Sequence, residues 1–226
     1  LVFSVKEKDA SAYVFGVLPE KKEIPLYGIE NVLMVQFIPG SFTWATGIPA
    51  DEVPPEGFKL EDVFPWALST MEGINAVDSE QEHSLLLRRF LDQCQAKKTG
   101  RRDSDEKMAA SIAGYMMQNR RAVRMKELED RYGYTARTLQ KLVLKNVGIT
   151  PKQLSLQICL QSAIRQLSDN KECSLTEMSH QMDFYDQSHF NRIFRKMTGL
   201  CPGEYIKRLE GRAAGEEPKQ IKHALS

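Results

Sequence analysis

The sequence predicts an α+β protein in which a β-rich N-terminal part with helices precedes an all-α C-terminal part. Short runs of β-branched and aromatic residues occur before residue 48, whereas apolar residues recur at helical spacing from residue 60 onward. A helix pair then occurs twice in the C-terminal half. A chain of 226 residues is long enough for two domains of about 100 to 120 residues each.

The stretch from Phe184 to Tyr205 predicts a short amphipathic helix with one apolar and one polar face. Its apolar residues recur at i, i+3, i+4 and i+7 and form a buried stripe: Phe190, Ile193, Phe194 and Met197. The opposite face carries side chains that can contact base edges and phosphates: Gln187, Ser188, Asn191, Arg192 and Lys196. Gly199 favours a helix end, and Pro202 prevents the same helix from continuing.

The same pattern occurs earlier in the chain, from Tyr134 to Pro151. An offset of fifty-one residues pairs Leu139 with Phe190, and the other matches follow at that offset: Gln140 with Asn191, Lys141 with Arg192, Lys145 with Lys196, Gly148 with Gly199 and Pro151 with Pro202. Upstream of each helix the offset is fifty, so the second copy has one extra residue in its turn. Two copies of helix, tight turn and helix predict a tandem helix-turn-helix arrangement.

These residues resemble the AraC/XylS-type bacterial transcription regulators over roughly Val123 to Lys207. The second unit carries the signature of that family: Gln-Ser-His-Phe, then Arg-x-Phe-Arg-Lys, then Gly-x-x-Pro-x-x-Tyr. Five positions depart from the family pattern: Glu129, Ser179, Asp183, Cys201 and Ile206. The resemblance implies double-stranded DNA as the partner, RNA polymerase as a further partner, and activation of transcription as the usual mode.

Helix geometry and the resemblance point to the same DNA-contacting residues. In the first unit, Arg137, Gln140 and Lys141 share one face near the start of the helix, where Arg can pair with guanine and Gln with adenine. The second unit offers the corresponding base-reading residues with two flanking ones: Gln187, Ser188, His189, Asn191 and Arg192. Lys145 and Lys196 lie toward the helix ends and are predicted to contact phosphates.

Charge is distributed unevenly between the two halves. Residues 1 to 100 hold 9 Lys/Arg against 15 Asp/Glu, and residues 101 to 226 hold 22 against 15, which gives net charges of −6 and +7. The half with the tandem motif is therefore the basic one, as expected for a domain that binds a polyanion.

The N-terminal part is expected to be β structure over residues 1 to 48. Strand-forming runs start at Tyr13 and Val32, Pro39-Gly40 is a turn signal, and another apolar run starts at Ser41. The segment from Gln36 to Glu52 is similar to the end of the cupin-like sensory domain found in one branch of the family, which suggests that strands before residue 1 are missing. A small-molecule effector is expected to contact aromatic residues of this part: Phe15, Tyr27, Phe37, Phe42 and Trp44.

The expected domain order is a sensory domain over 1–98, a linker over 99–106, the tandem helix-turn-helix domain over 107–210 and a disordered tail over 211–226. Helices are expected at 60–98, including a long one from Ser79 to Lys97 that either packs on its own domain or pairs with a second copy in a homodimer. The helix from Pro151 to Leu167 is expected to connect the two units at a fixed separation.

Cysteine and histidine spacing predicts neither a metal site nor a cofactor. The four cysteines are far apart, no Cys-x-x-Cys pair occurs, and no histidine lies at ligand spacing from them, which favours reduced thiols in the cytoplasm. No run of about 18 apolar residues predicts a membrane span, and the first residues do not resemble a signal peptide.

Two enzyme classes stay open as alternatives to a non-enzymatic regulator. A DNA-modifying enzyme with this DNA-binding module would need a reactive cysteine or metal cluster in a further domain, which the scattered cysteines do not supply. A cupin-type enzyme would need closely spaced His and carboxylate ligands, and residues 1 to 60 contain no histidine.

Overall fold

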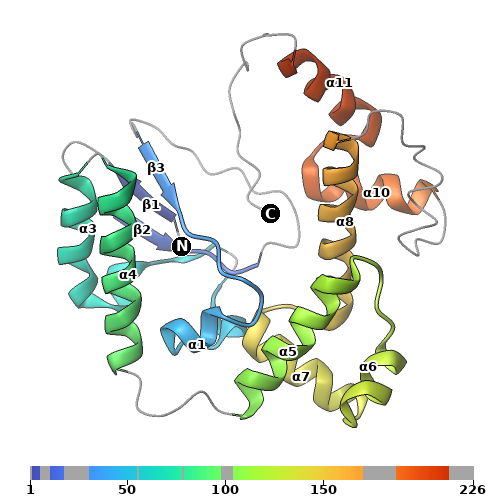
Figure 1. Ribbon diagram of the computed structural model, residues 1–226, viewed down its shortest axis with the longest axis horizontal. Coiled ribbons are helices and arrows are strands. Elements are labelled where there is room, and N and C mark those ends of the chain that lie inside the picture. The colour runs from blue at the N-terminus through green and yellow to red at the C-terminus, as the bar shows by residue number, and fades with distance from the viewer. Residues whose placement is uncertain are drawn as a thin grey trace. The chain divides into compact units, whose positions relative to one another are not determined.

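The computed structural model describes residues 2–5, 11–17, 31–54, 56–77, 79–97, 104–169 and 187–213. These residues form two compact units (Figure 1). Of the described residues, the first unit takes those up to 113 together with 137–150, and the second takes 114–136 and 151–213. Part of the predicted DNA-binding domain therefore belongs to the same compact unit as the N-terminal part.

A four-stranded antiparallel sheet forms the centre of the first unit. Its strands are β1 (Val2–Val5), β2 (Ser11–Val14), β3 (Asn31–Met34) and β4 (Phe58–Lys59), in the order β3-β1-β2-β4. The register sets Phe3 of β1 opposite Ala12 of β2 and opposite Leu33 of β3. The α+β prediction is confirmed in this coarse form, a small sheet with many helices.

The helices that follow β3 in the chain pack against the apolar residues of the sheet. They are α1 (Phe42–Thr46), η1 (Ala50–Glu52), α2 (Leu60–Val63), η2 (Pro65–Ala67), α3 (Leu68–Asn75) and α4 (Glu80–Lys97). Helices α3 and α4 run side by side, and α3 also contacts β1 (Figure 1). The core combines strand residues Ala12 and Val14 with the helical residues Leu60, Met71 and Phe90. Helices were expected over 60–98, and the described helices of this stretch lie between Leu60 and Lys97 with breaks between them.

The prediction of β structure through residue 48 is wrong for its last part, because Phe42–Thr46 is the helix α1. Gly40, at a φ of +82°, makes the turn that redirects the chain, and the Ala45 N–H then donates to the Ser41 carbonyl. The hydroxyl of Thr46 donates to the Phe42 carbonyl at 2.8 Å, and Gly47 ends the helix in the left-handed conformation. Local hydrogen bonds outweigh the strand preference of Phe42, Thr43 and Trp44 here.

The C-terminal helices are α5 (Ser104–Asn119), α6 (Met125–Tyr132), α7 (Ala136–Val147), α8 (Pro151–Asp169), α10 (Gln187–Thr198) and α11 (Pro202–Ala213). In the second compact unit, α8, α10 and α11 enclose an apolar core that contains Leu160, Phe190 and Phe194. The ring centroids of Phe190 and Phe194 lie 5.6 Å apart.

Two expected boundaries differ from the structure. Helix α5 begins at Ser104, inside the predicted 99–106 linker, because Asp105 and Glu106 place carboxylates in its first turn, where the helix dipole favours them. Helix α11 continues to Ala213, beyond the predicted domain end at 210. Three expected features lie outside the described residues: the tail beyond 213, the first helix of the second helix-turn-helix unit, and the extra residue in the turn of that unit.

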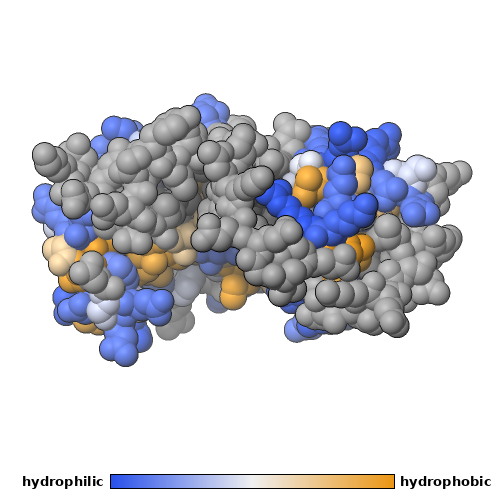
Figure 2. Space-filling view, turned by 90° about the horizontal axis from the view of Figure 1, so that it is seen from above, coloured by the Kyte–Doolittle hydropathy of each residue, from blue (hydrophilic) through white to orange (hydrophobic). Residues whose placement is uncertain are grey.

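In the first compact unit, hydrophobic side chains are exposed at the end of β3 and in the loop after it, and also on α2, α3 and α4. These residues are Met34, Ile38, Val63, Leu68 and Leu85. On the face shown in Figure 2, hydrophobic residues reach the surface between hydrophilic ones. No described helix is long and apolar enough to cross a membrane.

Candidate nucleic-acid interface

Helix α6, the turn over 133–135 and the start of α7 form the first helix-turn-helix unit. Gly133 ends α6 in the left-handed conformation at a φ of 73°, and its N–H donates to the Glu129 carbonyl at 2.9 Å. The N–H of Ala136, the first residue of α7, donates to Oε1 of Glu129 at 2.7 Å. Glu129 is one of the departures from the family pattern, and its carboxylate satisfies an otherwise free N–H at the start of α7.

Exposed and buried residues alternate along α7 at helical spacing. The buried residues are Leu139, Leu142, Val143, Asn146 and Val147. The exposed residues are Arg137, Thr138, Gln140, Lys141, Leu144 and Lys145. At about 100° per residue, the exposed positions share one side of the helix. The structure therefore brings together all four residues of this unit that the sequence analysis assigned to DNA: Arg137, Gln140, Lys141 and Lys145.

Helix α10 repeats this arrangement in the second helix-turn-helix unit. Phe190 and Phe194 are buried, and Ile193 and Met197 pack against the same core. The exposed residues are Gln187, Ser188, Arg192, Arg195 and Lys196. His189 and Asn191 are half-buried, so these two base-reading candidates are less accessible than their neighbours. We call the exposed residues of α7 and α10 the two basic faces.

The side-chain amide of Asn191 is not fully hydrogen-bonded by the described residues. Its Oδ1 is buried and has no hydrogen-bond partner among them.

Arg195 is an exposed basic residue that the sequence analysis did not assign. It lies in the last turn of α10 beside Lys196. At the offset of fifty-one it corresponds to Leu144, an apolar residue, so the comparison of the two copies gave it no match. The available signal was simply a basic residue on the polar side of an amphipathic helix.

Both helices carry positive charge and no acidic residue. The sequence of α7 contains Arg137, Lys141 and Lys145, and that of α10 contains Arg192, Arg195 and Lys196. The connecting helix α8 has 19 residues, so it is about 28 Å long at 1.5 Å per residue.

A cluster of polar and aromatic side chains joins the end of α5 to α6. Arg121 donates from both terminal nitrogens to the two carboxylate oxygens of Glu127, at 2.8 and 3.1 Å, and the hydroxyl of Tyr115 donates to the same carboxylate. The guanidinium of Arg131 lies 4.2 Å from the Tyr115 ring centroid. These contacts fix the start of the first helix-turn-helix unit. The sequence did not predict them, because the partners come from α5, from α6 and from the connection between them, and the packing of these elements decides which side chains meet.

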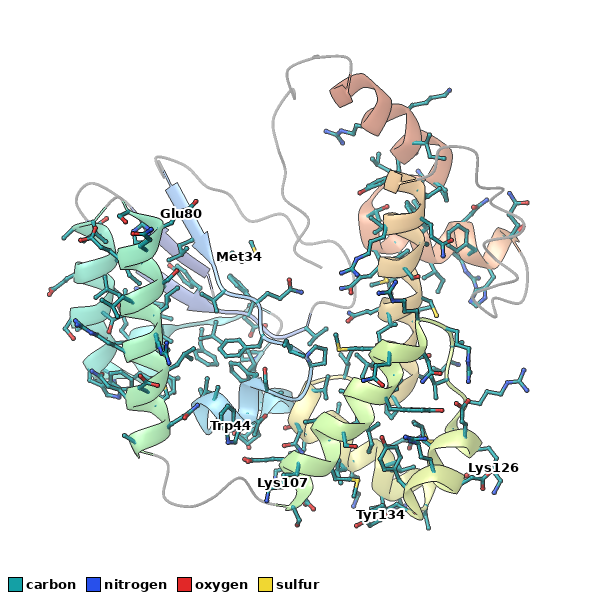
Figure 3. All side chains as sticks on the ribbon, in the orientation of Figure 1. Met34, Trp44, Glu80, Lys107, Lys126 and Tyr134 are labelled. Atoms are coloured by element: carbon teal, nitrogen blue, oxygen red, sulfur yellow. The ribbon has the colours of Figure 1, made fainter. Side chains whose placement is uncertain are left out.

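The same contacts shift two pKa values in opposite directions. Hydrogen bonds from Arg121 and then Tyr115 hold the pKa of Glu127 below its usual value, because both favour the ionised carboxylate. The hydrogen bond to Glu127 raises the pKa of the Tyr115 hydroxyl, since the proton is held between the two groups. On α6, a hydrogen bond with Asp130 raises the pKa of Lys126, an exposed side chain that is labelled in Figure 3.

The aromatic residues proposed for an effector are half-buried where the structure describes them, namely Phe15, Phe37, Phe42 and Trp44. The rings of Phe37 and Phe42 contact edge to face with their centroids 5.3 Å apart, and both side chains pack against the core of the first compact unit. Tyr27 lies outside the described residues. Within the described part of the chain, no group of three or more His, Cys, Asp or Glu side chains could hold a metal ion.

A helix-turn-helix unit followed by a connector and a second basic helix defines a class of DNA-binding domain. The family model described as "Helix-turn-helix domain" matches residues 128–208. This range includes every residue that the sequence analysis assigned to DNA contact.

Curated regulators match the same part of the chain. The HTH-type transcriptional activator RhaS of Pectobacterium carotovorum is 29% identical over 100 residues, which cover 44% of this chain and 36% of RhaS. RhaS of Escherichia fergusonii is 30% identical over 83 residues, 37% of this chain and 30% of that protein. The uncharacterized transcriptional regulatory protein YesN of Bacillus subtilis is 30% identical over 78 residues, 34% of this chain and 21% of YesN.

The C-terminal domain of AraT, a response regulator from Geobacillus stearothermophilus, aligns with 48% of this chain and 88% of its own chain at 16% identity and a TM-score of 0.42. This chain spans about a third or less of the length of the curated relatives it matches. The resemblance to AraC/XylS-type regulators is confirmed: the chain carries a helix-turn-helix domain of that type over residues 128–208.

Proposed function

We propose that this protein is a sequence-specific DNA-binding transcription regulator that reads double-stranded DNA through α7 and α10. The observation that carries the proposal is the pair of basic faces, each exposed on a helix whose opposite side is buried. Arg137, Gln140 and Lys141 would contact bases from the first unit, and Arg192 with Gln187 and Ser188 from the second. Lys145 and Lys196 would contact phosphates.

The proposed base contacts include two residues that the structure leaves half-buried. Asn191 would contribute through its amide, the group that pairs with adenine in the major groove. His189 would contact DNA at the edge of the same face. Arg195 joins the proposed phosphate contacts because it is exposed beside Lys196.

The wider role follows from the relatives that match this domain. Two of them are named transcriptional activators, so we propose activation in the cytoplasm, with RNA polymerase as a partner and a homodimer as the assembled form. Residues 1–98 would be a sensory domain, cupin-like in part, that responds to a small molecule bound near the aromatic residues Phe15, Tyr27, Phe37, Phe42 and Trp44. A division between the sensory domain and the DNA-binding domain before α5, which begins at Ser104, is proposed together with this role.

Selection of duplex DNA from a random pool tests the function. The full chain should enrich one motif with two parts, because the two units read separate major-groove segments about 34 Å apart. Footprinting on the enriched duplex should then show protection in two successive major grooves. Enrichment of no motif at any salt concentration would refute sequence-specific binding, and protection of one groove alone would refute the use of both helices.

A further inference from the structure

The segment from Pro39 to Glu52 contacts the C-terminal end of α7 within the first compact unit. Helix α1 and the turn η1 belong to this segment, and Figure 1 draws α1 close to one end of α7. This contact joins the N-terminal part to the first of the two proposed DNA-reading helices. Nothing in the proposed base contacts accounts for it.

A buried hydroxyl stands at the centre of this contact. The Oγ1 of Thr43 accepts a hydrogen bond from the Ala50 N–H at 3.1 Å and donates to the carbonyl of Asn146 at 3.5 Å. Thr43 is 4% exposed and Asn146 is 1% exposed. Asn146 belongs to the last turn of α7, where carbonyl groups have no partner within the helix, so the hydroxyl supplies a donor that the helix end lacks.

Backbone approaches backbone at two further points of the segment. Gly148, which follows α7, has its missing Cβ position 3.0 Å from the Ala50 carbonyl oxygen. Gly40 has the corresponding position 2.9 Å from Cα of Ala110 in α5. Both glycines also have positive φ values, 87° and 82°, so each position needs glycine for its conformation and for the space.

The segment leaves the basic face of α7 uncovered. Asn146 and Val147 are buried, whereas Arg137, Gln140 and Lys141 are exposed on the other side of the helix. The contact is thus compatible with DNA binding and does not mask the DNA-contacting residues. Its effect on α7 is to hold the last turn in place.

We propose that Thr43, with the backbone at Ala50, is a positioning residue for the first DNA-reading helix, so that the N-terminal part takes part in DNA binding through α7. The proposal rests on the proposed function and adds its intramolecular control. Helix α1 also carries Phe42, which packs against the core of the first unit, and Trp44 (Figure 3). A change in that core would therefore move α1 and reach α7 through Thr43.

Thr43→Val tests the proposal, because valine keeps the shape of threonine and replaces its hydroxyl with a methyl group that can neither donate nor accept a hydrogen bond. Thr46→Val is the matched control: Thr46 lies on the same helix and is 7% exposed. Among the described residues its hydroxyl bonds only locally, donating to the Phe42 carbonyl and accepting from the Ile48 N–H. Both full-length variants are titrated with the duplex selected by the wild-type protein, and with duplexes altered in one half of the motif. Arg137→Ala and Arg192→Ala identify the half that each helix reads.

Thr43→Val should bind the selected duplex about fivefold more weakly, the factor expected from one net hydrogen bond of roughly 1 kcal/mol, and should lose discrimination only in the half read by α7. Thr46→Val should keep the wild-type discrimination in both halves. Hydrogen exchange of the backbone amides in the last turn of α7 should be faster in Thr43→Val and unchanged in Thr46→Val. This measurement tests the contact directly, even where a loss of overall stability also lowers the DNA affinity.

Equal discrimination by the two variants in the α7 half would overturn the positioning role, and so would tighter binding by Thr43→Val, since that would make the contact inhibitory. A wild-type protein that selects no DNA motif would instead refute the proposed function, with the hydrogen-exchange comparison still deciding whether Thr43 holds the end of α7.

Discussion

Replacing Arg192 by alanine gives a sharp test of the second basic face. Arg192 is exposed on α10, and its guanidinium forms no salt bridge among the described residues. The substitution therefore breaks no salt bridge within the described part of the chain, and alanine favours the helix, so the free energy of unfolding should change by less than about 0.5 kcal/mol. Any loss of DNA binding can then be assigned to the interface.

The expected loss follows from the geometry of a guanidinium that contacts a base in two places. Such a contact contributes about 1 to 3 kcal/mol of discrimination, which is roughly a 5- to 150-fold difference in dissociation constant. Arg192→Ala should lose affinity within this range on the selected duplex and should lose its preference at one base pair, while preferences at the other positions stay unchanged.

Fluorescence anisotropy at fixed salt concentration, on the selected duplex and its single-base variants, measures both quantities. Arg165→Ala is the control, because Arg165 is also exposed on a helix of the same unit, α8, and its loss changes the net charge equally. Thermal unfolding of both variants checks that the fold is retained. If Arg192→Ala showed the affinity and the base preference of Arg165→Ala, the face assigned to DNA on α10 would be wrong.

Three further outcomes follow from the structure. Lys145→Ala should weaken binding to every sequence alike and reduce the slope of log K against log salt by about 1, as a salt titration would show; a sequence-dependent loss would contradict a phosphate contact. Glu129→Ala should lower the free energy of unfolding by about 1 kcal/mol in urea titrations, because the Ala136 N–H loses its acceptor; unchanged stability would argue against this cap. Glu127→Gln should destabilise the protein by up to about 1 kcal/mol at pH 7, because the ion pair with Arg121 is lost. The pKa of Glu127 is lowered from 4.5 in the folded state, so its contribution is present above that pH and is lost as the pH falls through the lowered pKa; wild type and variant should converge in acid, and a constant gap would contradict the ion pair.

The periodicity of the sequence was sufficient to predict the helices α7 and α10 and which of their faces are exposed. In α7 the residues predicted to point inward and outward do so, since a helix surrounded partly by core and partly by solvent shows its orientation in the spacing of its apolar residues. The same argument held for Phe190 and Phe194 in α10. Which base each residue contacts remains a prediction.

Periodicity was less informative in the N-terminal part. The run from Phe42 to Thr46 has strand-forming residues but is the helix α1, because the turn at Gly40 and short-range hydrogen bonds decide the backbone. A five-residue segment contains too little repetition to distinguish period 2 from period 3.6.

The sequence by itself determined the class of DNA-binding domain, the two helices and the residues on their exposed faces, because each of these depends on spacing within some twelve consecutive residues. Only the tertiary structure decided how the carboxylate of Glu127 joins Tyr115 to Arg121, and how Thr43 meets the end of α7 at Asn146. The second of these contacts joins residues 103 positions apart. A local pattern cannot encode such a pair, since the partner of a buried hydroxyl is chosen by the packing of the whole unit.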